Sequence, residues 1–509
     1  MPILRLMNSR RAGAALLALA AIVPLSAQAP RGGNVAASRS YATSAPANSR
    51  LAARIDSVLA RPHLARAHWG IEVRDASTGQ TLYARNAERL FIPASNLKLI
   101  VSAAAAHHLD PEHRFRTGLY AAGTVRDGTL EGDLVLYGRG DPMISARYFP
   151  SRTAVFDSLA DSLRAHGIRR ITGGIVADES WMDGEYVRGD WEAYDLRWWY
   201  AAPVGALGFN DNSIDFRIEP GAVAGAPARI TGSPASGAYT LQNASRTIAS
   251  GGRHTFDLER GPGPGAVRAY GQIPLGTGAS SESFAVDNPA RWTGTVFREV
   301  LERRGIEVGR DAVRIVSDPA SSTIGGLAPV VEWRSPPLPQ AIGPVLMNSQ
   351  NWFAELLVKT LGREVRGEGS WSAGLAVERA FLTDVVGIDS ADFVLRDGSG
   401  LSSGNLVTPR ALVRLLDYVR RTPRQAVVRR ALPVSGAQDG SLRSRLTDLR
   451  GRVAAKTGYI GNVDSLSGFV TMPDGREVIF CIIANGSGQP SARMKAGIDD
   501  VVRAIAAAG

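Results

Sequence analysis

Hydrophobic and polar residues follow two periods along this chain, and each period predicts a different element. Apolar residues at helical spacing mark residues 51–60 and a second stretch that Pro93 opens and that runs to about residue 109. Between them, residues 69–74 and 81–85 alternate like two strands around a turn at 76–79. The first hundred residues therefore predict a helix, a hairpin and a helix.

The pattern of apolar and polar residues changes between about residues 115 and 330. Short β-like runs at 133–137, 171–177, 213–218 and 255–258 are separated by Gly, Asp and Pro. A helical pattern at 293–304 closes the region. This composition predicts one or two β-rich domains.

Helical spacing returns after Ser335-Pro336-Pro337. It predicts helices at 351–361, 373–386 and 409–421, then strands at 452–458, 464–473 and 477–485, and a last helix at 491–507. The last two strands are joined by Pro473-Asp474-Gly475, a hairpin signal. No internal repeat of fixed period is visible, which excludes solenoids and propellers.

Composition narrows the chemistry. The chain has 509 residues, of which 44% are hydrophobic and 21% charged, so it can bury a large core. Its single cysteine, Cys481, excludes an internal disulfide and any Cys-rich metal site, and its position in an apolar strand predicts a core residue. No histidine follows His254, so there is no HExxH zinc motif. We expect no metal and no cofactor.

The N-terminus is typical of a secretory signal peptide. Arg5, Arg10 and Arg11 precede an apolar run that ends in Ala27-Gln28-Ala29, a small-x-small cleavage pattern. An uncleaved anchor would show the same pattern, but the apolar run is short for a membrane span. We expect a signal peptide at 1–29, a flexible Ala/Ser/Pro-rich linker at 30–50, and a mature protein in the bacterial periplasm that is not an integral membrane protein.

The net charge is +10, and arginine supplies nearly all of the positive charges, because only four of the 58 basic residues are lysines. Lysine can lose its proton when buried and act as a base, whereas arginine cannot, so the four lysines are candidates for chemistry. Export and the scatter of the arginines argue against nucleic acid as a partner. The basic stretch at 414–452 is interleaved with aspartates and reads as a solvated face or a surface toward an anionic polymer.

One of these lysines follows a serine at helical spacing. Ser95 and Lys98 share a helix face at i and i+3, in the only S-x-x-K of the chain. Apolar neighbours and the helix N-terminus both lower the pKa of such a lysine, so Lys98 can deprotonate Ser95. Free backbone N–H groups at the helix start can stabilise an oxyanion. The alternative is a helix-capping serine followed by an exposed lysine.

Two further short motifs carry hydroxyl and amine groups. Ser349-Gln350-Asn351 opens a predicted helix, where Ser349 could also be a simple cap. Lys456-Thr457-Gly458 lies on a strand, where a lysine and a hydroxyl can hold a carboxylate and a glycine leaves the edge open to an extended peptide. A second S-x-N, Ser403-Gly404-Asn405, sits in a Gly/Ser loop and ranks below the first.

S-x-x-K, S-x-N and K-T-G in this order are the signature of penicilloyl serine transferases. Gly400-Leu401-Ser402-Ser403-Gly404 also matches the G-x-S-x-G elbow of α/β-hydrolases. That fold needs a histidine after the serine, and none exists there, so we interpret this match as a decoy.

With these motifs, the chain resembles the low-molecular-mass class C penicillin-binding proteins, the penicillin-binding protein 4 type D-alanyl-D-alanine carboxypeptidase/endopeptidases. The long separation of Ser95 from Ser349 looks like the domain insertion of that family. Further family-like stretches lie at 132–142, 200–203, 397–402, 432–434 and 439–442. The resemblance implies an α+β fold with a penicillin-binding transpeptidase-like (β-lactamase-like) domain, its antiparallel sheet between helices. That domain would comprise residues 51–115 and 333–509, and residues 116–332 would form an inserted β-rich region of two small domains.

The resemblance also implies roles for single residues. Ser95 is expected to form an acyl-enzyme, Lys98 to take its proton, and Ser349 to relay a proton to the leaving group. Asn351 would bind the acyl-side peptide, and Lys456 and Thr457, beside Gly458, the terminal carboxylate. Backbone N–H groups of Ser95 and Tyr459 would form the oxyanion hole.

The expected substrates are peptidoglycan stem peptides and cross-links, with β-lactam antibiotics as covalent inhibitors. Two alternatives remain open from the sequence. A β-lactamase or esterase would use the same motifs with faster deacylation, although the long insertion favours the peptidase. A non-catalytic cell-wall-binding protein would have no need of an activatable serine. Arginines near 443–452 could favour an acidic peptide side chain.

Overall fold

The computed structural model describes residues 49–508. The predicted signal peptide and residues 30–48 of the predicted linker lie outside the described residues. Ser49 and Arg50, which we assigned to the linker, instead begin the first helix, α1 (Ser49–Leu59). Within residues 49–508, no helix combines the length and apolar composition that crossing a bilayer requires.

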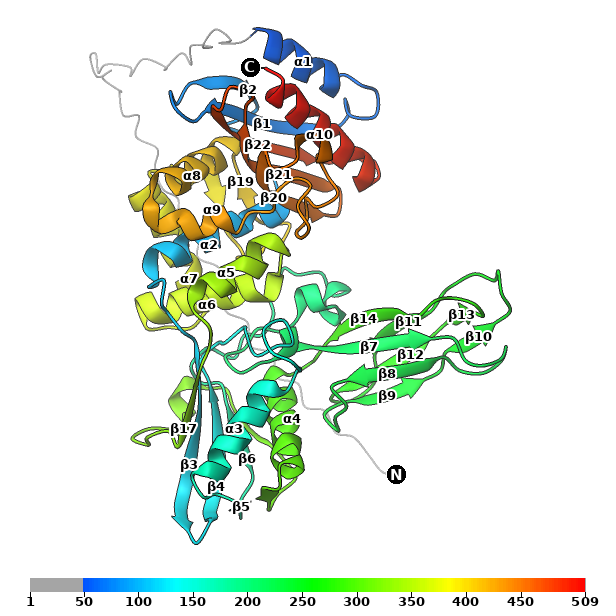
Figure 1. The fold of residues 1–509 in the computed structure, drawn as a ribbon, viewed down its shortest axis with the longest axis vertical. Helices are drawn as coiled ribbons and strands as arrows, with labels where there is room; N and C mark the ends of the chain where they lie inside the picture. The colour runs from blue at the N-terminus through cyan, green and yellow to red at the C-terminus, as the bar shows by residue number, and fades with distance from the viewer. Residues whose placement is uncertain (1–48, 509) are drawn as a thin grey trace, which may run out of the picture. The chain divides into compact units, whose positions relative to one another are not determined.

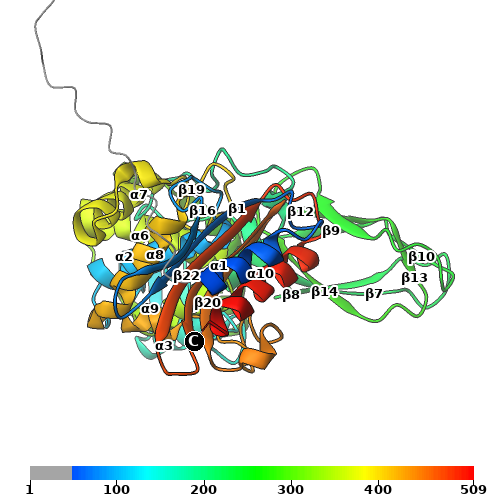
Figure 2. The same ribbon diagram turned by 90° about the horizontal axis from the view of Figure 1, so that it is seen from above.

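A five-stranded antiparallel sheet joins the first two and the last three strands of the described residues (Figures 1 and 2). Across the sheet the order is β2 (Thr81–Arg85), β1 (His68–Asp75), β22 (Glu477–Asn485), β21 (Val463–Thr471) and β20 (Val453–Ile460). The N-terminal hairpin β1–β2 joins the C-terminal strands through the pairing of β1 with β22. Strand β20 is therefore an edge strand.

Both faces of this sheet are covered by helices. Along β22, Phe480 and Ile482 pack in one apolar cluster with α1 and α10 (Ser491–Ala506), and Figure 2 shows these two helices side by side over the strands. The alternate residues Ile479 and Cys481 pack in a second cluster, with α2 (Lys98–His108) and α8 (Pro409–Arg421). Because successive side chains point to opposite faces, a strand buried on both faces reads as a continuous apolar run. Cys481 is fully buried, as predicted.

A group of helices packs beneath α2 and α8. It comprises α5 (Leu338–Met347), α6 (Asn351–Arg366), α7 (Trp371–Ala380) with the π-helical turn Phe381–Val386, and the short α9 (Ala426–Arg430). Two two-residue strands, β18 (Phe393–Val394) and β19 (Leu406–Val407), pair beside them. Helices α2 and α6 contact each other, so their N-terminal ends bring residues 98 and 351 together.

The middle of the chain forms a second, seven-stranded sheet. Its strands are β3 (Arg116–Arg126), β4 (Thr129–Gly138), β5 (Arg170–Ile171), β6 (Ile175–Asp178), β15 (Glu307–Val308), β16 (Arg314–Val316) and β17 (Val331–Arg334). Helices α3 (Ala154–Ala165) and α4 (Pro289–Arg303) share an apolar cluster with it.

Short antiparallel and parallel ladders make up the remaining insertion (green in Figure 1). They are the sheets β14-β7-β8, β11-β12-β9 and β10-β13, with bounds β7 (Ser213–Glu219), β8 (Arg229–Ser233), β9 (Thr240–Asn243), β10 (Arg246–Ile248), β11 (Asp257–Arg260), β12 (Ala266–Tyr270), β13 (Gln272–Pro274) and β14 (Ser280–Ala285).

The predicted α+β class, with an antiparallel sheet between helices, is confirmed. Among the elements that escaped the sequence analysis are β3, α3 and α5. Strand β3 is rich in Gly and Ala, which are weak strand formers, and α5 contains Pro344, a residue that usually ends a helix. The domain boundaries stay a prediction; strand β17 pairs with β3, so the second sheet extends to Arg334.

Candidate active site

Ser95 and Lys98 lie on a tighter helix than expected. Residues Ala94–Leu97 form a 3-10 turn, and the α-helix α2 begins only at Lys98. Side chains at i and i+3 eclipse on a 3-10 turn, so Ser95 and Lys98 face each other directly. The Nζ of Lys98 lies 2.8 Å from the Oγ of Ser95, which is the contact that a base needs with its nucleophile.

Lys98 is held on three sides. Besides Ser95, its Nζ donates to the Oδ1 of Asn351 at 2.6 Å and to the carbonyl oxygen of Ser399 at 2.7 Å. The side chain is fully buried, and this burial lowers the pKa of Lys98 to about 7. A substantial fraction of the amine is therefore neutral near neutral pH and able to accept the proton of Ser95.

A buried carboxylate fixes the loop that presents Ser399. Glu355, one turn after Asn351 on α6, accepts N–H groups from Gly398 at 3.0 Å and Ser399 at 2.7 Å, and the indole N–H of Trp371 at 2.8 Å. Burial raises the pKa of Glu355 to about 7, and the negative charge of Glu355 in turn raises the pKa of Lys98. Sequence reasoning missed Glu355; its i+4 spacing from Asn351 was the available signal.

Asp397 supports the same loop from the other side. Its carboxylate accepts N–H groups from Gly400 at 2.8 Å and Ser402 at 2.7 Å. Burial raises the pKa of Asp397. Because both carboxylates hold backbone N–H groups, the carbonyl of Ser399 is aimed at Lys98 with little freedom to move.

Ser349 and Lys456 form a second hydroxyl–amine pair. The Nζ of Lys456 donates to the Oγ of Ser349 at 2.9 Å and to the carbonyl of Thr457 at 2.7 Å. Lys456 is fully buried; its pKa lies well below the ordinary value because of burial and, second, the nearby Lys98. Ser349 has a φ of 60° in the turn between α5 and α6, so it is not a cap; Gln350 caps α6 instead.

Asn351 uses both ends of its amide within the protein. Its Oδ1 accepts from Lys98, and its Nδ2 donates to the carbonyl of Tyr200 at 2.6 Å. This contact brings the segment around Tyr200, from the insertion, to the site. The expected bond from Asn351 to an acyl-side peptide stays a prediction.

The edge strand β20 carries the KTG residues against the nucleophile. The Oγ1 of Thr457 donates to the Oγ of Ser441 at 2.8 Å, a residue to which sequence reasoning gave no role. A Cβ atom built at Gly458 would lie 2.2 Å from Ser465 Oγ and 3.1 Å from Ser95 N, so only glycine permits this approach. Tyr459 follows with an exposed side chain, and the oxyanion role of its N–H stays a prediction.

These residues border a cleft of about 220 Å³. Its lining comprises Ser95, Ser349, Ser441, Arg445, Thr457, Gly458, Tyr459 and Lys495. Arg445 forms an ion pair with Asp499 at 2.7 Å, and the Nζ of Lys495 lies 4.8 Å from the centre of the Tyr459 ring. Of the arginines at 443–452, Arg445 is thus the one that lines the cleft. Two cationic side chains, those of Arg445 and Lys495, thus line the same cleft as Thr457, where the substrate carboxylate is expected.

The two competing serine motifs lie in a structural loop. The Oγ of Ser402 donates to the Oδ2 of Asp190 at 2.5 Å, and Ser402 is buried. The amide of Asn405 forms its hydrogen bonds within the loop. Its Oδ1 accepts from Arg396 N at 2.7 Å, and its Nδ2 donates to Asp397 at 2.8 Å. Neither motif contributes a residue to the cleft lining.

A family profile described as D-Ala-D-Ala carboxypeptidase 3 (S13) matches residues 51–507 of this chain. The chain belongs to the S13 family. The matched range includes Ser95, Ser349 and Lys456, whose side chains meet in the site described above.

Named relatives agree with the S13 assignment. The chain is 35% identical over 450 residues to the D-alanyl-D-alanine carboxypeptidase of Actinomadura sp. strain R39, covering 86% of this chain and 81% of the relative. It is 26% identical over 430 residues to the D-alanyl-D-alanine carboxypeptidase DacB of Haemophilus influenzae, covering 82% and 85%. The crystal structure of penicillin-binding protein 4 (dacB) from H. influenzae superposes with a TM-score of 0.77 at 22% identity over 89% of this chain and 98% of that one. The S13 fold is therefore shared along nearly the whole described chain.

Proposed function

We propose that this protein is a serine-type D-alanyl-D-alanine carboxypeptidase and endopeptidase that acts on peptidoglycan stem peptides and cross-links through an acyl-enzyme on Ser95. The observation that carries the proposal is the pair of contacts Lys98–Ser95 and Lys456–Ser349, each between a buried amine and a hydroxyl. The names of the relatives, D-alanyl-D-alanine carboxypeptidases, support the substrate class.

In the acylation step, the Oγ of Ser95 attacks the carbonyl carbon of the D-Ala–D-Ala peptide bond as neutral Lys98 takes the Oγ proton. The C–N bond then breaks, and the hydroxyl of Ser349, tuned by Lys456, relays to the leaving amine the proton that Lys98 took from Ser95. Water hydrolyses the Ser95 ester in the second step and returns the free serine. Thr457 and Lys456 hold the carboxylate of the leaving residue, and the guanidinium of Arg445 adds positive charge on the cleft wall.

The proposal includes export. The signal peptide pattern at 1–29 predicts that the mature chain begins near Pro30 and resides in the periplasm. N-terminal sequencing of the protein purified from its native host gives the start directly. A chain that still begins at Met1 would contradict export by cleavage.

Intact-mass spectrometry after brief exposure to penicillin tests the acyl-enzyme. We expect one adduct per chain, mapped to Ser95, decaying over hours, and none in Ser95→Ala. An adduct that disappears within seconds while the drug is consumed would indicate a β-lactamase instead. A folded protein that forms no adduct and cleaves no stem peptide would indicate a wall-binding protein.

Synthetic substrates separate the two peptidase activities. A pentapeptide ending in D-Ala-D-Ala reports carboxypeptidase action, and a purified cross-linked muropeptide dimer reports endopeptidase action. Both should be lost in Ser95→Ala, because both need the same ester. Cleavage of the dimer that survives in Ser95→Ala would place the endopeptidase activity outside this site.

A further inference from the structure

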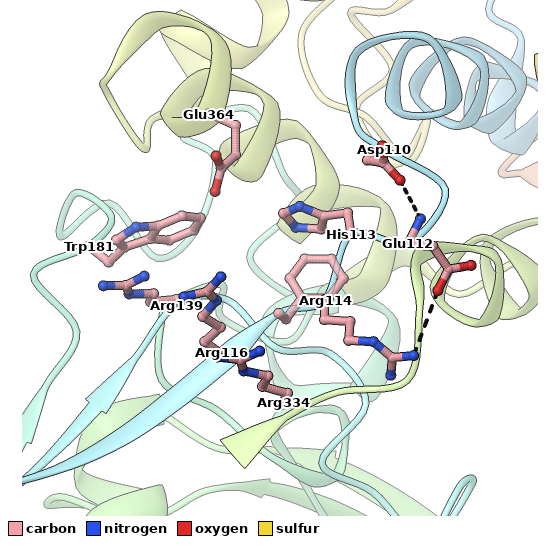
Figure 3. Close-up of a pocket in the computed structure, with 10 residues that line it drawn as sticks. Asp110, Glu112, His113, Arg114, Arg116, Arg139, Trp181, Arg334 and Glu364 are labelled. Atoms are coloured by element: carbon pink, nitrogen blue, oxygen red, sulfur yellow. Dashed lines mark hydrogen bonds and ion pairs between the residues drawn. The ribbon is translucent and has the colours of Figure 1, made fainter. Parts of the chain in front are cut away.

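A second cavity, of about 540 Å³, lies away from the active-site cleft, beside the C-terminal part of α6 and the ends of three strands (Figure 3). Its lining comprises Asp110, Glu112, His113, Arg114, Phe115, Arg116, Arg139, Trp181, Arg334 and Glu364. None of these residues lines the active-site cleft. The cavity is therefore a separate concave feature with its own charged lining.

Three of its arginines come from the same end of adjacent strands. Arg116 begins β3, Arg334 ends β17, and the register pairs these two residues directly. Arg139 follows β4, next to the pair Thr117–Gly138, and its N–H donates to the carbonyl of Arg116 at 3.1 Å. Like charges opposite each other on neighbouring strands are destabilising. The fold thus concentrates three guanidinium groups where repulsion opposes them.

The carboxylates of the protein compensate this charge only in part. Glu332 is shared: it lies 2.8 Å from Arg334 and 3.7 Å from Arg116. Among the residues that the structure describes, Arg139 forms no ion pair, and its guanidinium lies over the ring of Tyr137, 5.6 Å from the ring centre. One carboxylate therefore serves three guanidinium groups on this side of the cavity.

The other lining charges lie elsewhere on the wall. Asp110 accepts the N–H of Glu112 at 2.7 Å, Glu112 faces Arg114 at 3.7 Å, and in Figure 3 all three stand on the side of the cavity away from Arg139. Glu364, from α6, and the ring of His113 lie across the cavity from the three arginines. Burial lowers the pKa of His113, which disfavours a positive charge on this ring. The excess positive charge is confined to the side formed by β17, β3 and β4.

We propose that this cavity is a binding site for a small oxyanion, a carboxylate or a phosphate, held by Arg139 together with Arg116 and Arg334. Guanidinium groups bind both anions through paired N–H donors, and an anion here would supply the negative charge that Glu332 alone cannot. The carboxylate of Glu364 repels an anion, so the anionic part of the ligand would lie on the side of the three arginines. The site is independent of the chemistry at Ser95.

Isothermal titration calorimetry of the mature protein at low ionic strength tests the site, with pyrophosphate and glutarate as probes. We expect one equivalent of at least one probe to bind, and the affinity to fall at least about tenfold in Arg139→Gln, because a charge-assisted contact is lost. Arg334→Gln, at an exposed side chain, provides a second variant that removes a guanidinium without disturbing the core. Added salt should weaken binding in all proteins that bind.

Arg126→Gln is the matched control, because Arg126 is exposed at the opposite end of the same strand β3. Its affinity for the probe should equal that of the unchanged protein. Binding of pyrophosphate alone would identify a phosphate ligand, and binding of glutarate alone a carboxylate. The proposal is wrong if neither probe binds, or if binding persists unchanged in Arg139→Gln and Arg334→Gln.

Discussion

At the scale of single residues, this active site depends on amines that are forced out of water. Lys98 and Lys456 are both fully buried, and both donate to the hydroxyl of a serine. Burial disfavours the charged form of an amine, so each lysine can exist as a base at a pH where an exposed lysine would be protonated. Arginine, which makes up most of the basic residues, could not do this.

The pH dependence of acylation should report Lys98. Its pKa lies near 7, and the neutral form is the base, so the rate of penicillin acylation should rise about tenfold per pH unit below 7 and level off above it. In Glu355→Gln the profile should move to lower pH, because the charge that raises the pKa of Lys98 is lost. Stopped-flow mass spectrometry from pH 5 to 9 measures both profiles.

The groups that face Glu355 allow a matched control. They are Lys98, the carboxyl of Asp397, the indole N–H of Trp371 and the carboxyl of Glu378. Glu378 is buried, and burial raises its pKa well above the ordinary value, so Glu378→Gln should move the profile less than Glu355→Gln does. Equal profiles for the unchanged protein and Glu355→Gln would contradict the electrostatic role of Glu355.

At the scale of elements, the site is a junction between an edge strand and a helix start. Strand β20 reaches the turn of Ser95 only because residue 458 has no side chain. The sequence indicated a glycine that leaves the strand edge open to substrate. The structure adds a second reason, which is that the glycine lets the strand pack against the nucleophile.

Gly458→Ala should reduce the acylation rate at least about a hundredfold, because the new Cβ would push β20 from Ser95 and Ser465. Gly461→Ala is the control, since a Cβ atom there meets nothing within 4 Å. Penicillin-labelling rates of both variants, with thermal melts to verify folding, make the comparison. Equal rates would show that β20 can shift at no cost to the site.

Helix α7 carries a buried carboxyl group on Glu378. Among the residues that the structure describes, neither oxygen of this carboxyl has a hydrogen-bond partner. Glu378→Met, which keeps the length of the side chain, should stabilise the protein by roughly 1–3 kcal/mol. The pKa is raised in the folded protein, so its stability falls as pH rises above the ordinary value of 4.5, and the gain from Met should grow with pH. Denaturant titrations at pH 4.5 and 8 measure it; a gain that shrinks with pH would contradict this account.

Local patterns predicted more of the elements than of the contacts between them. Helix α8 and the hairpin of β21 and β22 follow from periodicity and turn residues, and the motif residues follow from their order along the chain. The roles of Glu355 and Ser399 could not be predicted in this way, because they arise only when α6 and a distant loop pack together. The second cavity could not be predicted from the sequence either, because its arginines become neighbours only through the register of the strands.

At the scale of the whole molecule, distant segments of one chain share a single site. Ser95, Ser349 and Lys456 come from three segments, and the sheet that supports them joins β1 to β22. The insertion contacts this site through Tyr200, whose carbonyl binds Asn351. The strands β10 and β13 take no part in the cleft lining.

A cut in the loop after β10 should therefore leave the chemistry intact. Gly251 and Gly252 lie in an exposed turn, and a Cβ atom at Gly251 would meet nothing within 4 Å. With a specific protease site inserted between them, the cleaved protein should remain one assembly by size-exclusion chromatography. It should acylate within about twofold of the uncut rate. Separation of the halves, or loss of labelling, would show that chain continuity here supports the site.

The pairing of β1 with β22 also decides when during its life this molecule can react. The nucleophile is translated well before the strand that flanks it, β20, and the strand that pairs with β1, β22. A chain that lacks these C-terminal strands should therefore show no acylation of Ser95, rather than a reduced rate. Covalent labelling by a β-lactam would count finished molecules only, which makes the drug a reporter of completed synthesis.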